Sequence, residues 1–466
     1  MKAEFYKPSQ FNYTTFNDAG DLLIYNTFSG VLCKALAKNS DKVLQLLSEE
    51  TVDRERIEYP LLAKAQYLVP SYADEHALLH SMTERFLNSS LLELTILPTH
   101  QCNCRCVYCY EDFQSGIMSE KTQRNLVKFV KKRLRHCTGL YVSWFGGEPL
   151  VAMDVIRNLS AQFIEICKTE KKRYTASMTT NGTLLTLETL RELQKYRVLI
   201  YQITIDGSRE THDMQRPLVG GGSSYDLIMD NLLKIKETIK VKNFQILLRT
   251  NITKQSFSDM ESYIRKMEKL FGGDTRFQIS FNVAADWGGE RIESYRNNLL
   301  VEDDNVPEKM NSLISQLNTT LDFGGGLGAG EGICFNPGCH VDKNNSFLIE
   351  ANGSIGKCAQ QTRSNFPEIG NLSGDDFYLD EFELVKWTSS VHPKIHEKCT
   401  KCFLLPIGCY RSYSCILRRY RTKYMDEGYE EEPECPQIFE KLNSDLCMRE
   451  KNGNFYQLEG VEFDAR

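Results

Sequence analysis

The chain has 466 residues, of which 41% are hydrophobic and 25% charged, a balance typical of a soluble globular protein. Its net charge of −6 gives no sign of bulk affinity for nucleic acid, so we expect no nucleic-acid partner. No stretch approaches the roughly 20 apolar residues that span a bilayer, and no secretory signal is visible at the start, so we expect a cytoplasmic protein with no membrane partner.

Residues 1 to about 90 mix short strands with short helices. Strands are predicted at 11–15 and 22–25, joined by a turn at Asn17-Asp18-Ala19-Gly20. Helices are predicted near 30–37, 41–48, 59–65 and 74–89. This combination indicates a small winged-helix-like domain, and the lack of a basic recognition helix argues against DNA binding.

Residues 92 to about 283 alternate strands with helices, within a domain expected over residues 91–315. The predicted strands lie at 92–97, 140–145, 176–180, 199–205, 244–251 and 277–283, and the predicted helices at about 119–134, 152–168, 186–196, 224–240 and 257–270. Six strands that alternate with helices imply a parallel sheet covered by helices, so we predict an α/β fold. Polar or glycine-rich motifs end nearly every strand, which is where sites gather in β/α barrels.

Residues 316–450 are irregular and rich in cysteine, and residues 451–466 are expected to form a C-terminal tail. Sixteen cysteines in a long chain without a signal peptide indicate metal binding in a reducing compartment rather than disulfides.

A short loop after the first core strand carries Cys102, Cys106 and Cys109 in the spacing C-x3-C-x2-C. Three thiolates on one loop can bind three irons of a [4Fe–4S] cube and leave the fourth iron open for a substrate or cofactor. Cys104 lies within the same run and is interpreted as a bystander. The alternative is a structural zinc site with His100 as fourth ligand.

This loop, with Tyr108 and Tyr110 around its last cysteine, resembles that of the radical S-adenosylmethionine (SAM) enzymes. The resemblance implies that residues 91–315 form a partial (β/α)6 TIM barrel, open on one side, as the radical SAM core. It also implies that Cys102, Cys106 and Cys109 hold the catalytic cluster.

Further motifs extend the resemblance along the strand ends. The run Gly146-Gly147-Glu148-Pro149 follows the second strand and resembles the family's binding site for the SAM amino group. The resemblance implies further SAM contacts, one from the cysteine loop and the others from the ends of the following strands. They are Tyr108, Asn181, Thr204, Asp206, Arg216 and either Arg249 or Asn251. Of these, Thr204 is assigned to the ribose or methionine moiety and Arg216 to the carboxylate.

The order of the C-terminal cysteines resembles that of the SPASM domain, which carries two auxiliary [4Fe–4S] clusters. By position, the first would be bound by Cys334, Cys339, Cys358 and Cys415, and the second by Cys399, Cys402, Cys409 and Cys435. The last spacings are slightly longer than the common pattern. Without Cys334 or Cys415 as a ligand, the first cluster would keep an open iron for a substrate thiolate. The alternative is zinc on His392, His396, Cys399 and Cys402.

The N-terminal domain resembles the PqqD-like domain that recognises leader peptides in enzymes that modify ribosomally made peptides. In that family an extended leader adds a strand to a sheet edge. The resemblance therefore implies a radical SAM/SPASM peptide maturase that forms a thioether or C–C crosslink in a precursor peptide. Its expected cofactors are SAM and three [4Fe–4S] clusters, and its expected electron donor is a flavodoxin or ferredoxin.

Two alternatives remain. An anaerobic sulfatase-maturating enzyme, which makes formylglycine, would place an Asp base directly after the cysteine equivalent to Cys358, where this chain has Ala359. A non-catalytic iron–sulfur electron carrier or peptide-binding protein would explain the cysteines but not the ordered motifs at Glu148, Asn181 and Asp206.

Overall fold

The computed structural model of the chain describes residues 4–57, 60–111, 113, 116–285, 292, 295, 297, 306–317, 319–323, 338–359, 366–389, 400–407, 438–451, 453 and 455–458. The chain divides into two compact units. The sheet unit comprises Ser89–Ala329 and Asn344–Lys386, and the small unit comprises Met1–Asn88, Gly330–Lys343 and Trp387–Arg466.

Six parallel strands, each paired with the next in chain order, form the centre of the sheet unit. They are β7 (Leu91–Ile96), β8 (Gly139–Trp144), β9 (Arg173–Thr180), β10 (Val198–Thr204), β11 (Gln245–Ile252) and β12 (Phe277–Val283). Because the strands are parallel, their carboxyl ends lie along one edge of the sheet, and the polar motifs that follow them are brought together there.

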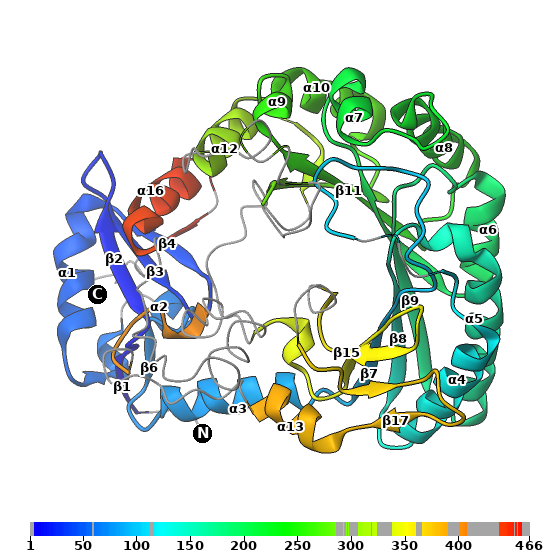
Figure 1. Cartoon of the computed structure of the whole chain (residues 1–466). Helices are drawn as coiled ribbons and strands as arrows, with labels where there is room; N and C mark the ends of the chain where they lie inside the picture. The colour runs from blue at the N-terminus through cyan, green and yellow to red at the C-terminus, as the bar shows by residue number, and fades with distance from the viewer. Residues whose placement is uncertain are drawn as a thin grey trace. The chain divides into compact units, whose positions relative to one another are not determined.

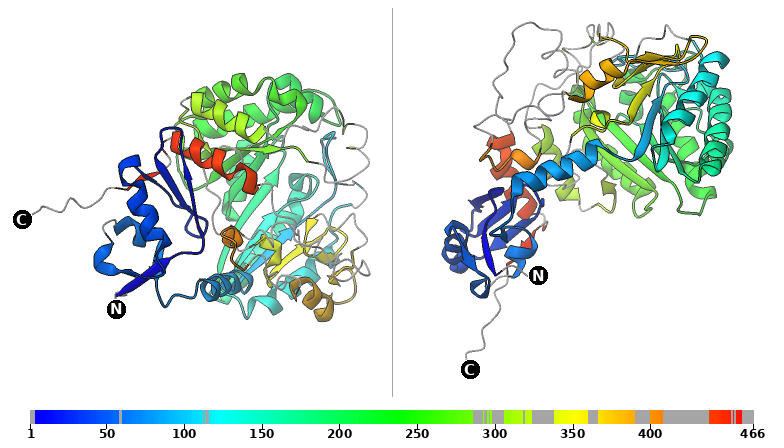
Figure 2. Two further views of the ribbon diagram at one scale, coloured as in Figure 1. Left: turned by 90° about the vertical axis from the view of Figure 1, so that its left-hand side faces the viewer. Right: turned by 90° about the horizontal axis from the view of Figure 1, so that it is seen from below.

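The helices of this unit cover the outer face of the curved sheet, as Figure 1 shows and the views in Figure 2 support. They are α4 (Glu120–Leu134), α5 (Met153–Thr169), α6 (Leu187–Lys195), α7 (Arg209–Gln215), α8 (Ser224–Thr238), α9 (Lys254–Phe257), α10 (Met260–Phe271) and α12 (Val306–Leu317), with a 3-10 turn η2 at Pro149–Ala152. Local sequence sets where they begin: the Ser119 hydroxyl accepts a hydrogen bond from the Thr122 N–H at 3.1 Å and caps α4.

The sheet continues beyond both ends of the six-strand core. β13 (Asp322–Phe323) pairs with β12, and β14 (Ser346–Ile349) lies parallel to β7. An antiparallel ladder then follows, formed by β15 (Ser354–Gly356), β16 (Gly370–Asn371) and β17 (Tyr378–Leu379), with α13 (Glu381–Ser389) after it. The described strands thus form one open eleven-stranded sheet with no closed barrel.

The structure confirms the predicted alternation of six parallel strands and helices in the core. It also shows what the pattern did not indicate, namely the pairing of β14 with β7 across some 250 residues of chain. Within the described residues, no helix combines the length and apolar content that crossing a bilayer requires.

The small unit contains two sheets. One has three strands, in the order β5 (Val52–Asp53), β1 (Phe5–Pro8) and β6 (Leu68–Pro70). The other has four strands, in the order β18 (Tyr456–Gln457), β4 (Leu32–Ala35), β3 (Leu22–Asn26) and β2 (Asn12–Phe16). The helices are α1 (Ala37–Ser48), α2 (Pro60–Lys64), α3 (Glu75–Leu87) and α16 (Ile438–Lys451).

The helix predicted near 30–37 is wrong, because this segment forms strand β4, paired antiparallel with β3. Neighbouring residues explain the difference. Leu32 packs into a cluster with Leu23 and Tyr25, whereas Cys33 packs into a second cluster with Leu22 and Ile24. Successive side chains enter two different cores, and only an extended strand points them to opposite faces.

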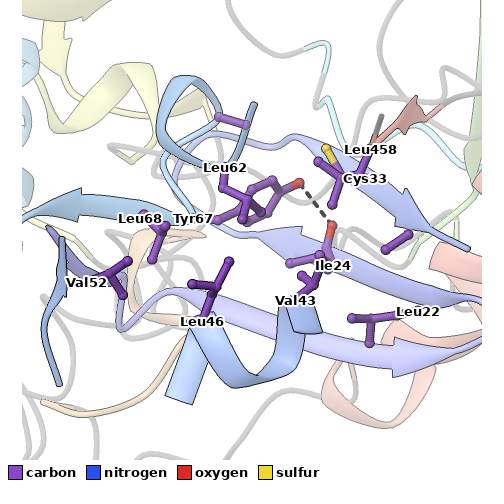
Figure 3. Close-up of a cluster of buried hydrophobic side chains, with 12 residues drawn as sticks. Leu22, Ile24, Cys33, Val43, Leu46, Val52, Leu62, Tyr67, Leu68 and Leu458 are labelled. Atoms are coloured by element: carbon purple, nitrogen blue, oxygen red, sulfur yellow. Dashed lines mark hydrogen bonds between the residues drawn. The ribbon is translucent and has the colours of Figure 1, made fainter. Parts of the chain in front are cut away.

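Figure 3 shows the larger of these two clusters, in which the buried side chains of β3, β4, α1 and β6 meet. Tyr67 lies within it, and its hydroxyl donates to the Ile24 carbonyl oxygen at 3.0 Å. The phenol is therefore buried with its polar end satisfied.

Asn26, at the end of β3, is fully buried and joins the two sheets of the small unit. Its amide nitrogen donates to Ser9 Oγ (3.1 Å), Asn12 Oδ1 (2.9 Å) and the Gln66 carbonyl (3.1 Å). Its Oδ1 accepts from the backbone N–H groups of residues 28 and 29. The side chain thus satisfies several buried polar groups at once.

We expect Asn26→Ala to destabilise the small unit by about 2 kcal/mol or more, because the buried groups around it would lose a shared partner. Native-state hydrogen exchange of the β3 amides measures this local free energy. Asn88→Ala, at an exposed position, is the control and should change it by less than about 0.5 kcal/mol. Equal effects of the two substitutions would contradict the role of Asn26.

Candidate active site

The cysteine loop, residues 98–110, follows β7 at the carboxyl edge of the sheet. Cys106 is buried, whereas Cys102 and Cys109 are partly exposed. The backbone of the loop is held by the segment that ends α7: the N–H of Arg105 donates to the Pro217 carbonyl at 2.8 Å, and that of Val107 to the Gln215 carbonyl at 2.9 Å.

Gly146 and Gly147, after β8, lie directly against the start of this loop. Gly146 has φ +112°, and a Cβ atom there would lie 2.5 Å from the Thr99 carbonyl oxygen. At Gly147 a Cβ would lie 2.5 Å from the His100 carbonyl oxygen and closer still to that of Gln101. The glycines therefore allow two backbones to touch, and the Glu148 N–H donates to the Gln101 carbonyl at 2.8 Å.

Glu148 is fully buried, and its carboxylate accepts three hydrogen bonds. The donors are the Leu150 N–H (3.0 Å), the Thr180 hydroxyl (2.7 Å) and the Asn181 N–H (2.7 Å). Burial raises the pKa of Glu148 to about 7, and the three hydrogen bonds act in the opposite direction. The carboxylate ties the end of β8 to the end of β9.

Asn181 links the end of β9 to the cysteine loop. Its amide nitrogen donates to Asn103 Oδ1 at 2.8 Å and lies 3.8 Å from Cys102 Sγ. The Asn103 amide in turn donates to the Thr183 hydroxyl at 2.8 Å. These contacts fix the loop next to Cys102.

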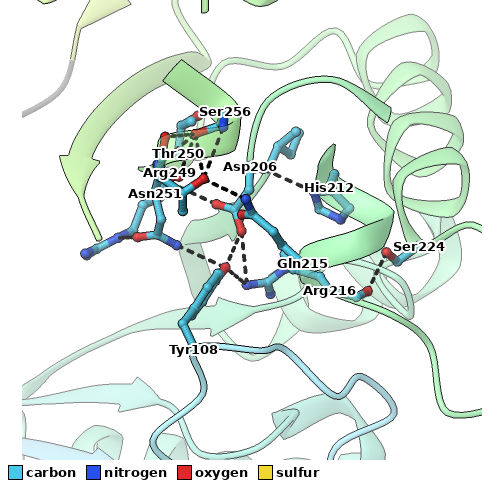
Figure 4. A network of polar contacts seen from close by, with 12 residues as sticks. Tyr108, Asp206, His212, Gln215, Arg216, Ser224, Arg249, Thr250, Asn251 and Ser256 are labelled. Carbon is cyan, nitrogen blue, oxygen red and sulfur yellow. Dashed lines mark hydrogen bonds and ion pairs between the residues drawn. The ribbon is translucent and has the colours of Figure 1, made fainter. Parts of the chain in front are cut away.

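The hydroxyl of Tyr108 joins the loop to the ends of β10 and β11, as Figure 4 shows. It donates to Asp206 Oδ2, and it accepts from Arg216 Nη1 at 2.6 Å and from the Asn251 amide at 3.2 Å. Asp206 is fully buried, also accepts from the Asn251 N–H at 2.9 Å, and lies 3.9 Å from Arg216 Nη1. Burial raises the pKa of Asp206, while Arg216, Tyr108 and Asn251 act in the opposite direction.

Arg216 keeps one donor available. The residue is only 8% exposed, and among the described residues its Nε finds no hydrogen-bond partner. A buried guanidinium N–H without a partner is costly, and an anionic ligand would satisfy it.

His100 lies between two buried acidic side chains. Its Nδ1 is 3.9 Å from Glu111 Oε2 and its Nε2 is 3.6 Å from Glu350 Oε2. Glu350 directly follows β14, whose pairing with β7 brings it to the start of the cysteine loop. These contacts connect the cysteine loop, through His100, to the strand added beside β7.

The thiols of the loop differ in their surroundings. A hydrogen bond from the Cys104 thiol lowers the pKa of Cys102 to about 6, against the effect of burial. Burial raises the pKa of Cys106 to about 12 and also raises that of Cys109.

Among the described residues, no group of three or more His, Cys, Asp or Glu side chains is arranged to hold a single metal ion. The donor chemistry, three thiols on one glycine-supported loop, fits the [4Fe–4S] cluster implied by the sequence.

The structure brings together most of the residues predicted for the site. Cys102, Tyr108, Gly146, Gly147, Glu148, Asn181, Asp206 and Arg216 are connected by the contacts above. Pro149 begins the turn η2, Thr204 is buried at the end of β10, and Arg249 donates to Asn251 Oδ1 at 3.2 Å. Whether these residues bind SAM stays a prediction.

The C-terminal ligand predictions fall mostly outside the described residues. Those outside are Cys334, Cys399, Cys409, Cys415 and Cys435, together with His392 and His396 of the zinc alternative. Of the others, Cys339 is exposed, and Cys358 and Cys402 are partly buried.

Sequence reasoning missed three contributors to the site. Asn103 lies inside the cysteine motif, and an asparagine at that position carries no signal of its own in the sequence. His212 accepts the Asp206 N–H at 3.1 Å, and burial lowers its pKa to about 3, so it acts as a neutral acceptor. Glu350 could not be found, because only the β14–β7 pairing brings it to the loop.

Comparison with known proteins identifies the core. Residues 96–264 match the Radical SAM superfamily, so the chain contains a radical SAM domain. The superfamily implies an enzyme that uses SAM and a [4Fe–4S] cluster.

Among curated proteins, Fe-coproporphyrin III synthase of Methanosarcina barkeri (strain Fusaro / DSM 804) is 26% identical over 171 residues, covering 37% of this chain and 39% of the relative. The cysteine-type anaerobic sulfatase-maturating enzyme of Clostridium novyi (strain NT) is 27% identical over 195 residues, which cover 39% of this chain and 50% of the relative. The chain thus aligns with half or less of each relative's length.

Among solved structures, native anSMEcpe with bound AdoMet superposes with a TM-score of 0.55 at 19% identity, covering 78% of this chain and 98% of that chain. At this identity the likeness concerns the fold.

We expect Gly147→Ala to abolish stable cluster binding, because the new methyl group would push the cysteine loop away from β8. Iron content and cluster absorbance after anaerobic reconstitution measure the effect. Gly220→Ala is the matched control, since a Cβ there meets no atom within 4 Å. A Gly147→Ala protein with normal iron content would show that the close approach is not required.

Proposed function

We propose that this protein is a radical SAM enzyme that modifies a ribosomally made precursor peptide and forms a thioether or C–C crosslink in it. The observation that carries the catalytic part is the cysteine loop, fixed on the carboxyl ends of β8 to β11 by buried polar contacts. The peptide part rests on the resemblance of residues 1–90 to a PqqD-like leader-recognition domain and of residues 316–450 to a SPASM domain.

Cys102, Cys106 and Cys109 would hold the cluster, which together with SAM would supply hydrogen abstraction by a 5′-deoxyadenosyl radical. The protein's own residues bind and orient the cofactor. A carboxylate has about four lone-pair sites, and the protein's donors use three on Glu148, so one remains for the SAM ammonium group. The unpartnered Nε of Arg216 suits the SAM carboxylate.

Other residues support this arrangement. Tyr108 and Asp206 hold Arg216 in place, and Asn181 holds the loop beside Cys102. Thr204, the last residue of β10, would contact the ribose or methionine moiety of SAM, and Arg249 or Asn251 on β11 would line the adenosine. The C-terminal cysteines, including Cys339, Cys358 and Cys402, would hold two auxiliary clusters, and a flavodoxin or ferredoxin would supply electrons.

A sulfatase-maturating activity is the second candidate, and one observation favours it. The curated relative from Clostridium novyi, 27% identical over 195 residues, is a cysteine-type anaerobic sulfatase-maturating enzyme. Ala359 after Cys358 argues against it, because a methyl group cannot act as the expected base. Formation of an aldehyde in a sulfatase-derived cysteine peptide would decide for this candidate.

We expect the anaerobically reconstituted protein to form 5′-deoxyadenosine from SAM under strong reductant and to hold about twelve irons per chain, as three four-iron clusters require. Substituting Cys102, Cys106 and Cys109 together by Ala should abolish cleavage and remove about four irons. A full complement of iron without any cleavage of SAM would instead indicate an electron carrier or a binding protein.

We expect Glu148→Gln to weaken SAM binding by roughly tenfold or more, because a charge-assisted hydrogen bond is lost, while the iron content stays unchanged. In the wild type, the SAM affinity should fall as the pH is lowered from 8 to 6, because Glu148 becomes protonated near pH 7. The variant should lack this pH-dependent fall. Equilibrium binding of SAM at several pH values tests both statements, and identical profiles would remove the assignment.

A further inference from the structure

Cys104 is the cysteine of the loop to which the proposed function gives no role. It is 1% exposed, whereas Cys102, two positions earlier, is partly exposed. Two contacts join them: the Cys104 N–H donates to Cys102 Sγ at 3.4 Å, and the Cys104 thiol donates a hydrogen bond to the same sulfur. The two side chains therefore lie against each other within the loop.

The backbone bends between the two cysteines, at Asn103. The Asn103 side chain accepts from the Asn181 amide and donates to the Thr183 hydroxyl, each at 2.8 Å. Its carbonyl oxygen accepts the Val219 N–H at 2.9 Å. A bend brings the flanking Cα atoms closer together, and a disulfide requires them to lie within about 7 Å of each other.

One guanidinium group closes the same turn. Arg105 Nη1 donates to the carbonyl oxygens of Cys102 at 2.6 Å and Cys104 at 2.9 Å. The guanidinium carbon lies 4.2 Å from the centre of the Phe113 ring. Both carbonyls thus meet at one group, which fixes the spacing of the two cysteines.

The sulfur atoms can reach each other by side-chain rotation. The Cys104 sulfur is joined to its own backbone nitrogen through Cα and Cβ, and that nitrogen already lies 3.4 Å from Cys102 Sγ. Rotation about the Cα–Cβ bond of Cys104 therefore moves its sulfur toward Cys102 without any movement of the backbone. A disulfide across two positions closes a short ring, and strained disulfides are the ones that are easily reduced.

We propose that Cys102 and Cys104 form a reversible disulfide in the cluster-free protein, with Cys102 as the attacking thiol and Cys104 as the resolving one. Cys102 attacks one sulfur of a small disulfide and releases one small thiol. The buried Cys104 then attacks Cys102 in the mixed disulfide and releases the second. Two S–H bonds are replaced by one S–S bond in the protein, and the two electrons and two protons convert the small disulfide into two thiols.

The consequence for the enzyme rests on the proposed function. With Cys102 as a cluster ligand, the disulfide removes one of three ligands, so loading of the cluster requires its reduction. The disulfide also keeps Cys102 from the irreversible step to sulfinic acid. Cys104 thereby preserves a partly exposed ligand for a later cluster.

The sequence makes the pair easy to follow by mass spectrometry. The tryptic peptide of residues 86–105 contains Cys102 and Cys104 and no other cysteine, and the next peptide, residues 106–121, contains the other two cysteines of the loop. An internal disulfide leaves the first peptide lighter by two hydrogen atoms and unreactive toward alkylating reagents. A disulfide to either of the other two cysteines would join the two peptides.

The test uses the full-length protein, freed of iron by chelation and held anaerobically in buffers with different ratios of oxidised to reduced glutathione. After acid quenching and alkylation, we expect the ratio of disulfide to dithiol to be roughly tenfold or more higher in peptide 86–105 than in peptide 106–121. Dithiothreitol should reverse the reaction. Cys104→Ser is the matched control and should accumulate a glutathione adduct on Cys102 that the wild type resolves.

Three results would overturn the proposal. They are a wild-type protein that keeps the adduct as Cys104→Ser does, a crosslink between the two peptides, and a peptide 86–105 that stays reduced in oxidised glutathione. The wild-type measurement stands without the variant, so poor folding of Cys104→Ser leaves the test decisive.

These outcomes are separable from those of the proposed function. The assay needs neither SAM nor a strong reductant, so absence of SAM cleavage leaves its result intact. Oxidised protein should take up about four irons fewer than reduced protein. A disulfide that forms without lowering iron uptake would keep the thiol pair and reject Cys102 as a cluster ligand.

Discussion

The contact between two stretches of backbone, Gly146–Gly147 and Thr99–Gln101, is the constraint on which the site depends. A side chain at either glycine would meet a carbonyl oxygen, so the cysteine loop can lie on the end of β8 only because both side chains are absent. Once the loop is placed there, Cys102 comes within reach of Asn181 and the Tyr108 hydroxyl within reach of Asp206. The other polar contacts hold a position that the glycines make possible.

Burial of charge is the cost of this arrangement, and hydrogen bonding offsets it. Glu148 and Asp206 are both fully buried, and burial raises the pKa of each. Each carboxylate nevertheless accepts hydrogen bonds from the ends of neighbouring strands, which stabilises its ionised form. The strand ends are thereby linked to one another as well as to the loop by a network of buried hydrogen bonds.

The core of the fold was predictable because its signals are local. Alternating strands and helices, the Ser119 cap and the glycine–glutamate run can each be recognised within a few residues. The helix predicted near 30–37 failed because Leu32 and Cys33 enter different clusters, which no local pattern reveals. The positions of Glu350 and β18 could not be predicted for the same reason, because pairing between strands distant in the sequence determines them.

In both units a strand from later in the chain pairs with the edge of a sheet, but the two strands differ in length and burial. All four residues of β14 are buried, and the strand pairs with β7 along its whole length. β18 contributes two paired residues, one of them largely exposed. Four paired and buried residues give β14 more ladder hydrogen bonds and more apolar burial than the two paired residues give β18. Both strands nevertheless occupy backbone groups that an uncovered edge would offer to another chain.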